Sequence, residues 1–213
     1  QRCVKMDIQQ TKNDLFDAAV KKTGLDDFGG NTFHEGLDAL LYAIKHEAQL
    51  NFRGKVFLHD ILLIPLLINR LHVRDWVNHH PEIIDEKIKA PVFVVGLPRS
   101  GTSFFHNLLA LDPTSRFLAD WEAHAPCPPP QIFNNPADPR IQRAQRLNKW
   151  VQRIAPELNK SVALHLMTGM PEECLWLLQH EFKSKGFGLY FQIPGYIEWL
   201  ANCDLQSAYE YHN

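Results

Sequence analysis

A short run of glycines, hydroxyl residues and one arginine is the part of the sequence best suited to chemistry. The run reads Gly-Leu-Pro-Arg-Ser-Gly-Thr-Ser from residue 96 to residue 103, with glycines at positions 96 and 101. Glycine adopts backbone conformations that other residues avoid, and it lets a ligand approach the main chain closely. The hydroxyl side chains can donate hydrogen bonds, and Arg99 supplies a permanent charge that can hold a phosphate by two bonds. These residue types at this spacing predict an anion-binding loop.

The residues on either side of the loop predict the elements that would hold it. Residues 92–95 form a short apolar, mostly β-branched run, which predicts a buried strand of a parallel sheet. Residues 102–111 carry phenylalanine and leucine at helical spacing, so the loop would lead directly into a helix. The N–H groups of that helix's first turn would point into the loop. Strand, loop and helix N-terminus together predict a phosphate-binding loop.

The loop differs at one position from that of the nucleotide triphosphatases. Those proteins share the glycine spacing but place a lysine, which reaches the β- and γ-phosphates, where this sequence has Thr102. The positive charge lies instead inside the loop, at Arg99. This difference argues against hydrolysis of ATP or GTP. A P-loop kinase-like phosphotransferase stays open as an alternative, although it lacks the expected lysine.

At residues 98–103 the sequence resembles the P-loop sulfotransferases, which use 3′-phosphoadenosine 5′-phosphosulfate (PAPS) as the sulfuryl donor. The loop of that family reads Pro-Arg/Lys-Ser-Gly-Thr-Thr/Ser, and the segment matches it position by position. Residues 107–113, 121–122 and 171–174 look like the branch of the family often found in bacterial and invertebrate sequences. The resemblance extends from about Leu15 to the end of the chain.

The resemblance implies transfer of a sulfuryl group from PAPS to a hydroxyl or amine acceptor. The acceptor class stays open between a small molecule, a glycan and a lipid, and the scheme requires no metal. Arg99 is also expected to take part in catalysis. The residues expected to bind PAPS are Pro98, Arg99, Ser100, Gly101, Thr102 and Ser103.

Sulfuryl transfer needs a base that takes the proton from the attacking hydroxyl. In several branches of the family a glutamate just beyond the loop helix has this role, and Glu122 matches its position. A glutamate that only caps a helix or faces solvent is the structural alternative. His124 is a second candidate for the base.

Composition limits the classes of partner. The chain has 213 residues, 45% of them hydrophobic, and a formal net charge of -2, so no general attraction to nucleic acid is expected. Its four cysteines form no Cys-x-x-Cys pair, which favours reduced thiols and a cytoplasmic location. The longest apolar run, residues 61–68, is too short to span a bilayer and contains Pro65. The composition leaves the oligomeric state open.

The first part of the chain predicts a helical region, residues 1–89. A helix around Leu15 would end at Gly24, and Thr32 with Glu35 would form a capping box at the start of the next helix. A third helix is expected from about residue 56 to residue 76, with Pro65 kinking or interrupting it. The P-loop sulfotransferase domain would follow over residues 90–213.

The second part of the chain predicts fewer strands than a complete sheet requires. Residues 115–119 predict a second strand and residues 188–191 a third, and Pro171 suits the first turn of a helix. Residues 140–153 predict a helix with a basic face, which is either solvated or able to attract an anion. Tyr196 is expected to pack or to line an acceptor pocket.

We therefore expect an α/β fold of the P-loop nucleotide-hydrolase type, with a parallel sheet covered by helices on both faces and preceded by the helical region. The second cofactor motif of the family, an arginine and a serine that bind the 3′-phosphate, is missing, so an incomplete domain is expected. A catalytically inactive nucleotide-binding or interaction module is the alternative from another class. Binding of the donor product without transfer would favour that module.

Overall fold

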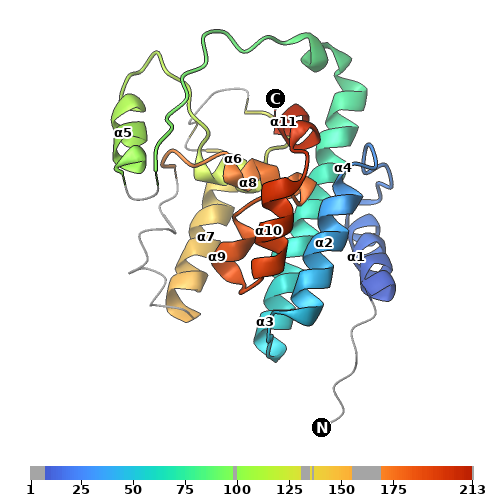
Figure 1. The fold of residues 1–213 in the computed structure, drawn as a ribbon. Coiled ribbons are helices and arrows are strands. Elements are labelled where there is room, and N and C mark those ends of the chain that lie inside the picture. The colour runs from blue at the N-terminus through green and yellow to red at the C-terminus, as the bar shows by residue number, and fades with distance from the viewer. Residues whose placement is uncertain (1–7, 98–99, 131–134, 136, 155–168, 213) are drawn as a thin grey trace. The chain divides into compact units, whose positions relative to one another are not determined.

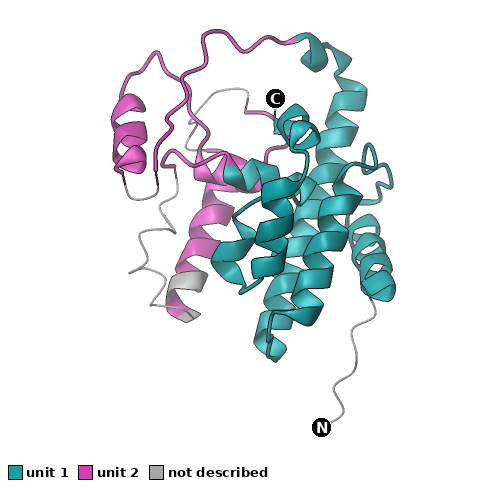
Figure 2. Ribbon diagram, in the orientation of Figure 1, with its two compact units in different colours: residues 1–85, 175–213 teal, residues 86–174 magenta. Residues whose placement is uncertain are grey.

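Contacts divide the chain into two compact units. The computed structural model describes residues 8–97, 100–130, 135, 137–154 and 169–212. Unit 1 combines residues 1–85 with residues 175–213, and unit 2 consists of residues 86–174 (Figure 2). The first helices of the chain therefore pack with the last ones, although all of unit 2 separates them in sequence. The predicted domain division between residues 89 and 90 stays a prediction.

Unit 1 is built from helices (Figure 1). Helix α1 packs against α4, and α2 packs against α10. A π-helical segment joins α3 to α4, and short 3-10 helices follow α4 and α8. The elements are α1 (Ile8–Thr23), α2 (Phe33–His46), α3 (Phe52–Val56), η1 (Phe57–Leu63), α4 (Ile64–His79), η2 (Pro81–Asp85), α8 (Leu175–Leu178), η4 (Gln179–Glu181), α9 (Phe187–Tyr190), α10 (Pro194–Asn202) and α11 (Gln206–His212).

The first two helices confirm the prediction from apolar spacing. Helix α1 ends at Thr23, and Gly24 follows with a φ of 73°, a left-handed conformation that glycine adopts readily. The N–H of Gly24 donates to the carbonyl of Val20 across 2.7 Å. Helix α2 turns one apolar face into the core of unit 1. The side chains on that face are at most 3% exposed: Leu37, Leu40, Leu41 and Ile44.

The capping box predicted for Thr32 and Glu35 is wrong. The Thr32 hydroxyl donates to Oε2 of Glu181 across 2.9 Å and caps no helical N–H. Glu35 lies 3.3 Å from Nζ of Lys183. Arg70 of α4 pairs with the same Glu181, and both side chains are at most 3% exposed. Glu181 and Lys183, from the C-terminal part of unit 1, therefore bind the two side chains that the local spacing predicts would cap the helix.

Pro65 does not interrupt its helix, because the turns before it change their hydrogen bonding. Proline lacks an N–H and its ring clashes with the carbonyl four residues earlier, which is Ile61 here. The segment η1 surrounds Ile61, and its π-helical geometry accommodates the proline within one continuous helical stretch, residues 52–79.

By length and hydropathy that stretch could cross a membrane, and no other described helix passes the same test. Core helices of globular proteins also pass it, and side chains of this stretch such as Leu67 and Leu71 are fully buried in unit 1.

Unit 2 contains three α-helices in its described part, joined by irregular segments. They are α5 (Thr102–Leu109), α6 (Asp120–His124) and α7 (Pro139–Ile154). Residues 118–120 pair with residues 170–172 through two backbone hydrogen bonds: Glu172 N–H to Leu118 (2.8 Å) and Asp120 N–H to Met170 (3.1 Å). This short antiparallel contact, centred on Ala119 and Pro171, holds the start of α6.

The predicted parallel sheet with helices on both faces is wrong for this structure. The described residues form no strand, and their one β-type contact is the isolated bridge of Ala119 with Pro171. Residues 92–97, expected as a buried strand and its exit, are irregular, and Val92, Phe93 and Val95 are each at least 77% exposed. A strand needs a neighbour that pairs with its N–H and C=O groups, and no described segment takes that place here.

The other predicted elements fail for related reasons. Residues 188–191 include most of α9, a short helix whose neighbours in unit 1 bury Phe187 and Phe191. Pro171 takes part in the bridge to Ala119 instead of starting a helix, and the next helix begins at Leu175. In each case a tertiary contact outweighs the local preference.

Candidate functional site

Each of the two glycines of the predicted anion-binding loop lies where a larger residue would not fit the described structure. A Cβ added to Gly96 would lie 2.6 Å from Oγ of Ser100 and 2.8 Å from Cγ2 of Thr102, so a larger residue would displace both. Gly101 has a φ of 90°, which favours glycine, and it immediately precedes α5. The N–H of Ser100 donates to the carbonyl of Leu97 across 3.1 Å and closes a turn.

Helix α5 starts where the sequence predicts. The first N–H donor with a helical acceptor in this turn belongs to Phe105, which donates to Gly101 across 3.0 Å. Helix geometry leaves the N–H groups before it without an intrahelical acceptor, and the helix dipole favours an anion beside them. Thr102 and Ser103 lie in this turn and are half-buried. Pro98 and Arg99, the other predicted ligands, lie outside the described residues.

Glu122 lies on the short helix α6 and is buried, at 4% exposure. Its Oε2 accepts the N–H of Ala119 across 3.1 Å, which is the N-terminal capping contact of the helix. Its Oε1 lies 2.7 Å from Nη2 of Arg116, whose side chain is 57% exposed. Among the described residues no hydrogen bond or ion pair joins Glu122 to the loop. The structural alternative, a capping glutamate, is therefore present in this conformation.

The backbone of residues 169–172 fixes the N-terminal end of α6. Oδ1 of Asp120 accepts the N–H of Gly169 across 2.5 Å. Burial raises the pKa of the Asp120 carboxyl, and hydrogen bonds from the N–H groups of Gly169 and Trp121 act in the opposite direction. A buried carboxyl group without hydrogen-bond donors would lower the stability of the fold. The bond from Gly169 avoids this cost and also holds α6 against the segment of residues 169–172.

His124, the second candidate for the base, and His106 of the loop helix lie in different settings. His124 is the last residue of α6, and burial of its imidazole lowers the pKa of the ring although the residue as a whole is exposed. His106 lies on α5, half-buried, and burial lowers the pKa of its imidazole while the charge of Glu173 raises it. Among the described residues no group of three or more potential metal ligands lies together.

Arg140 is the functional-site neighbour that sequence reasoning missed. It was expected on a basic helix face, and Arg143, Arg146 and Lys149 of that face are exposed. The Arg140 guanidinium instead lies over the ring of Trp121, with Cζ 4.6 Å from its centroid, and donates to backbone carbonyls after α6. The sequence signal that could have identified it is Asp138, two residues earlier, which can turn the side chain inward.

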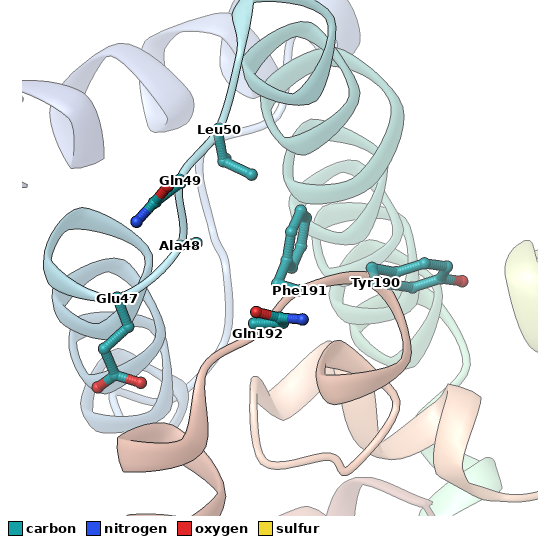
Figure 3. Close-up of a pocket in the computed structure, with 7 residues that line it drawn as sticks. All are labelled: Glu47, Ala48, Gln49, Leu50, Tyr190, Phe191 and Gln192. Carbon is teal, nitrogen blue, oxygen red and sulfur yellow. The ribbon is translucent and has the colours of Figure 1, made fainter.

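Unit 1 contains a cavity of about 300 Å³ between the loop after α2 and the loop between α9 and α10 (Figure 3). Its lining mixes one carboxylate, two carboxamides and aromatic rings: Glu47, Ala48, Gln49, Leu50, Tyr190, Phe191 and Gln192. None of the predicted site residues lines it.

Tyr196 does not line this cavity either. It is 1% exposed, its hydroxyl donates to Phe182 O (2.8 Å) and accepts the N–H of Ser184 (3.1 Å), and burial raises its pKa. Of the two roles expected for Tyr196, packing is confirmed.

Comparisons with known proteins match the part of the chain that contains the loop. The profile of the sulfotransferase family matches residues 91–211. Sulfotransferase STF1 of Mycobacterium tuberculosis H37Rv is similar in structure, with a TM-score of 0.79 and 31% identity over 94% of this chain and 55% of that protein. Sulfotransferase STF9 of Mycobacterium avium has a TM-score of 0.80 and 25% identity, over 94% of this chain and 51% of its own.

The chain thus spans about half the length of these solved structures. No curated protein matches it. The family profile nevertheless covers more than half of the chain and includes the loop, α5, α6 and the segment of residues 169–174. The chain therefore belongs to the sulfotransferase family.

Proposed function

We propose that the protein transfers a sulfuryl group from PAPS to a hydroxyl acceptor, which is a small molecule, a glycan or a lipid. The observation that carries the proposal is the glycine-closed loop that opens α5 in a chain of this family. Gly96 and Gly101 let the backbone of the loop close, and the first turn of α5 leaves N–H donors beside it. This arrangement fits an anionic group such as the 5′-phosphosulfate of the donor.

The residues of the loop would bind the donor and stabilise the charge that develops during transfer. PAPS supplies the sulfuryl group and leaves as 3′-phosphoadenosine 5′-phosphate (PAP). The donor would accept hydrogen bonds from the backbone N–H groups and from the hydroxyl groups of Ser100, Thr102 and Ser103. Arg99 would add a positive charge beside it. Donors already in place are effective because they need no reorganisation when negative charge grows on the departing phosphate oxygen.

Glu122 is the proposed base. Its carboxylate would take the proton of the acceptor hydroxyl as that oxygen forms its bond to sulfur and the bond from sulfur to the phosphate oxygen breaks. Each carboxylate oxygen accepts one hydrogen bond in this conformation and keeps a further lone pair that could take the proton. Of its two partners, Arg116 is the one that could also move away, because its side chain is largely exposed while the Ala119 N–H belongs to the helix end. His124 stays the alternative base.

Two measurements test the proposal. Calorimetric titration should show binding of PAP, and incubation with radiolabelled PAPS and a panel of phenols, sterols and oligosaccharides should give a labelled product. Glu122→Gln should lower kcat by about 10²–10⁴-fold, the range of a general base, with PAP affinity unchanged. The amide oxygen of glutamine still accepts the Ala119 N–H, so the helix end is kept. Glu86→Gln, at an exposed position of unit 2, is the matched control.

The outcomes separate the candidate functions. Binding of PAP without transfer to any acceptor would favour the inactive binding module. The hydrogen bonds of Glu122 with Arg116 and Ala119 are the observation that supports this alternative. Transfer of phosphate from ATP would favour the kinase-like alternative. A Glu122→Gln variant with full activity would remove Glu122 from the mechanism and direct attention to His124.

A further inference from the structure

We propose that Arg140 is a positioning residue for Glu122, acting through the C-terminal end of helix α6; this inference rests on the proposed function. Helix α6 has five residues, too few to be stable without tertiary contacts. The backbone pairing of residues 118–120 with residues 170–172 holds its first end. The contacts of Arg140 hold its other end.

The guanidinium joins α6 to the proline-rich segment that follows it. Nη1 of Arg140 donates to the carbonyl of Ala125, which caps the C-terminus of α6, across 3.0 Å. The same nitrogen donates to the carbonyl of Pro128 across 2.6 Å. A cation is also favoured at this end of a helix by the helix dipole. Arg140 therefore fixes both the last turn of α6 and the direction in which the chain leaves it.

The same guanidinium contacts the helix through Trp121. Cζ of Arg140 lies 4.6 Å from the centre of that ring, and Trp121 is 1% exposed. Trp121 directly precedes Glu122, so a shift of the ring would carry the carboxylate with it. Arg140 does not contact Glu122 itself, which makes its effect on the carboxylate indirect.

Asp138 holds the guanidinium in its place. Its two carboxylate oxygens accept from Nε (3.0 Å) and Nη2 (2.7 Å) of Arg140, a fork that lysine cannot reproduce. The two side chains are 11% and 14% exposed, so the ion pair is partly desolvated. Arg143, one turn further along α7, is exposed and offers a matched control.

A double-mutant cycle on the whole protein tests the assignment. Arg140→Lys should lower kcat by about 10–100-fold, since a displacement of about 1 Å at a reacting group can cost two orders of magnitude. The KM for PAPS should change less than about twofold, because the donor loop is made of other residues. Arg143→Lys should leave both constants unchanged.

The decisive comparison uses the Glu122→Gln background. If Arg140 acts through Glu122, Arg140→Lys should change the residual rate of Glu122→Gln by less than about twofold in single-turnover transfer of labelled sulfuryl. An equal loss in both backgrounds would show a general structural role and overturn the proposal, as would full activity of Arg140→Lys.

A second variant guards against misfolding. Asp138→Asn keeps the guanidinium but weakens the fork, so it should give a smaller loss of kcat that also disappears in the Glu122→Gln background. An Asp138→Asn loss that persists there would contradict the assignment even if Arg140→Lys does not fold. A wild-type protein that binds PAP but transfers nothing would contradict the proposed function itself, a result distinguishable from any change confined to the variants.

Discussion

Unit 1 buries its apolar side chains, whereas the first part of unit 2 exposes them. In unit 1, Leu40 and Leu67 are fully buried, and rings such as Phe33 and Phe182 are at most 1% exposed. In unit 2 the exposed apolar side chains follow one another along residues 92–111, with exposures of 50–88%: Val92, Phe93, Val95, Leu97, Phe104, Phe105, Leu108 and Leu111. Apolar burial is the main favourable term in folding, so the two units are stabilised in different ways.

The exposed apolar side chains of unit 2 lie on both sides of the predicted anion-binding loop. Exposed apolar side chains in this number favour packing of the segment against another polypeptide segment. Among the described residues of the loop, Gly96 lies close to Ser100 and Thr102, and Gly101 leads directly into α5. Around α6, the polar contacts of Arg140 and Arg116 add to the burial of Ala119, Trp121 and Ala123.

The largest effect should come from the buried ion pair of unit 1. Arg70→Met should destabilise unit 1 by about 3–5 kcal/mol, because it leaves the Glu181 carboxylate buried without its cation. Chemical denaturation followed by circular dichroism measures this loss. Arg74→Met is the control, since the pair of Arg74 with Asp27 is about half exposed and should contribute about 1 kcal/mol or less. Equal losses of unfolding free energy for the two variants would show that burial does not determine how much an ion pair contributes to stability.

The next effect compares one apolar truncation in each unit. Leu40→Ala should cost about 2–5 kcal/mol, because it opens a cavity in a closed core. Leu108→Ala removes a side chain that is 52% exposed, and about 0.5 kcal/mol or less is expected. The same denaturation experiment measures both. A large loss for Leu108→Ala would mean that the apolar face of α5 is covered in solution.

The smallest effect concerns acid. Hydrogen bonds from the Arg140 guanidinium hold the pKa of the Asp138 carboxyl below its usual range. A lowered pKa in the folded state means that the unfolded state binds more protons, so the stabilisation is complete above the ordinary aspartate pKa of about 4 and is lost as the pH falls below it. Asp138→Asn should therefore flatten the decline of Tm in this acid range. An unchanged dependence of Tm on pH in the variant would show that the Asp138–Arg140 ion pair contributes little to stability.

Much of the candidate site could be predicted because its determinants are local. The glycines at 96 and 101, the hydroxyl residues and the apolar spacing of residues 102–109 suffice to predict a tight turn that opens a helix. Gly24 ends α1 for an equally local reason, the left-handed conformation that it adopts. The proposed roles of Glu122 and Arg99 stay predictions.

The rest depended on contacts that no local pattern reveals. Residues 92–95 carry the composition of a buried strand, yet a strand exists only where a neighbouring segment pairs with it, and the described chain offers none. The side chains of Thr32 and Glu35 have capping-box spacing, but Glu181 and Lys183 engage them from the far end of the chain.

Local residue type and spacing thus determined the loop, the start of α5 and the first helices, because backbone conformation and apolar periodicity are properties of a few neighbouring residues. Only the tertiary structure decided that the C-terminal helices complete unit 1, that Arg140 turns toward Trp121, and that Glu122 is engaged by Arg116. Those outcomes depend on which distant groups come within hydrogen-bonding or van der Waals distance, and sequence separation carries little information about that.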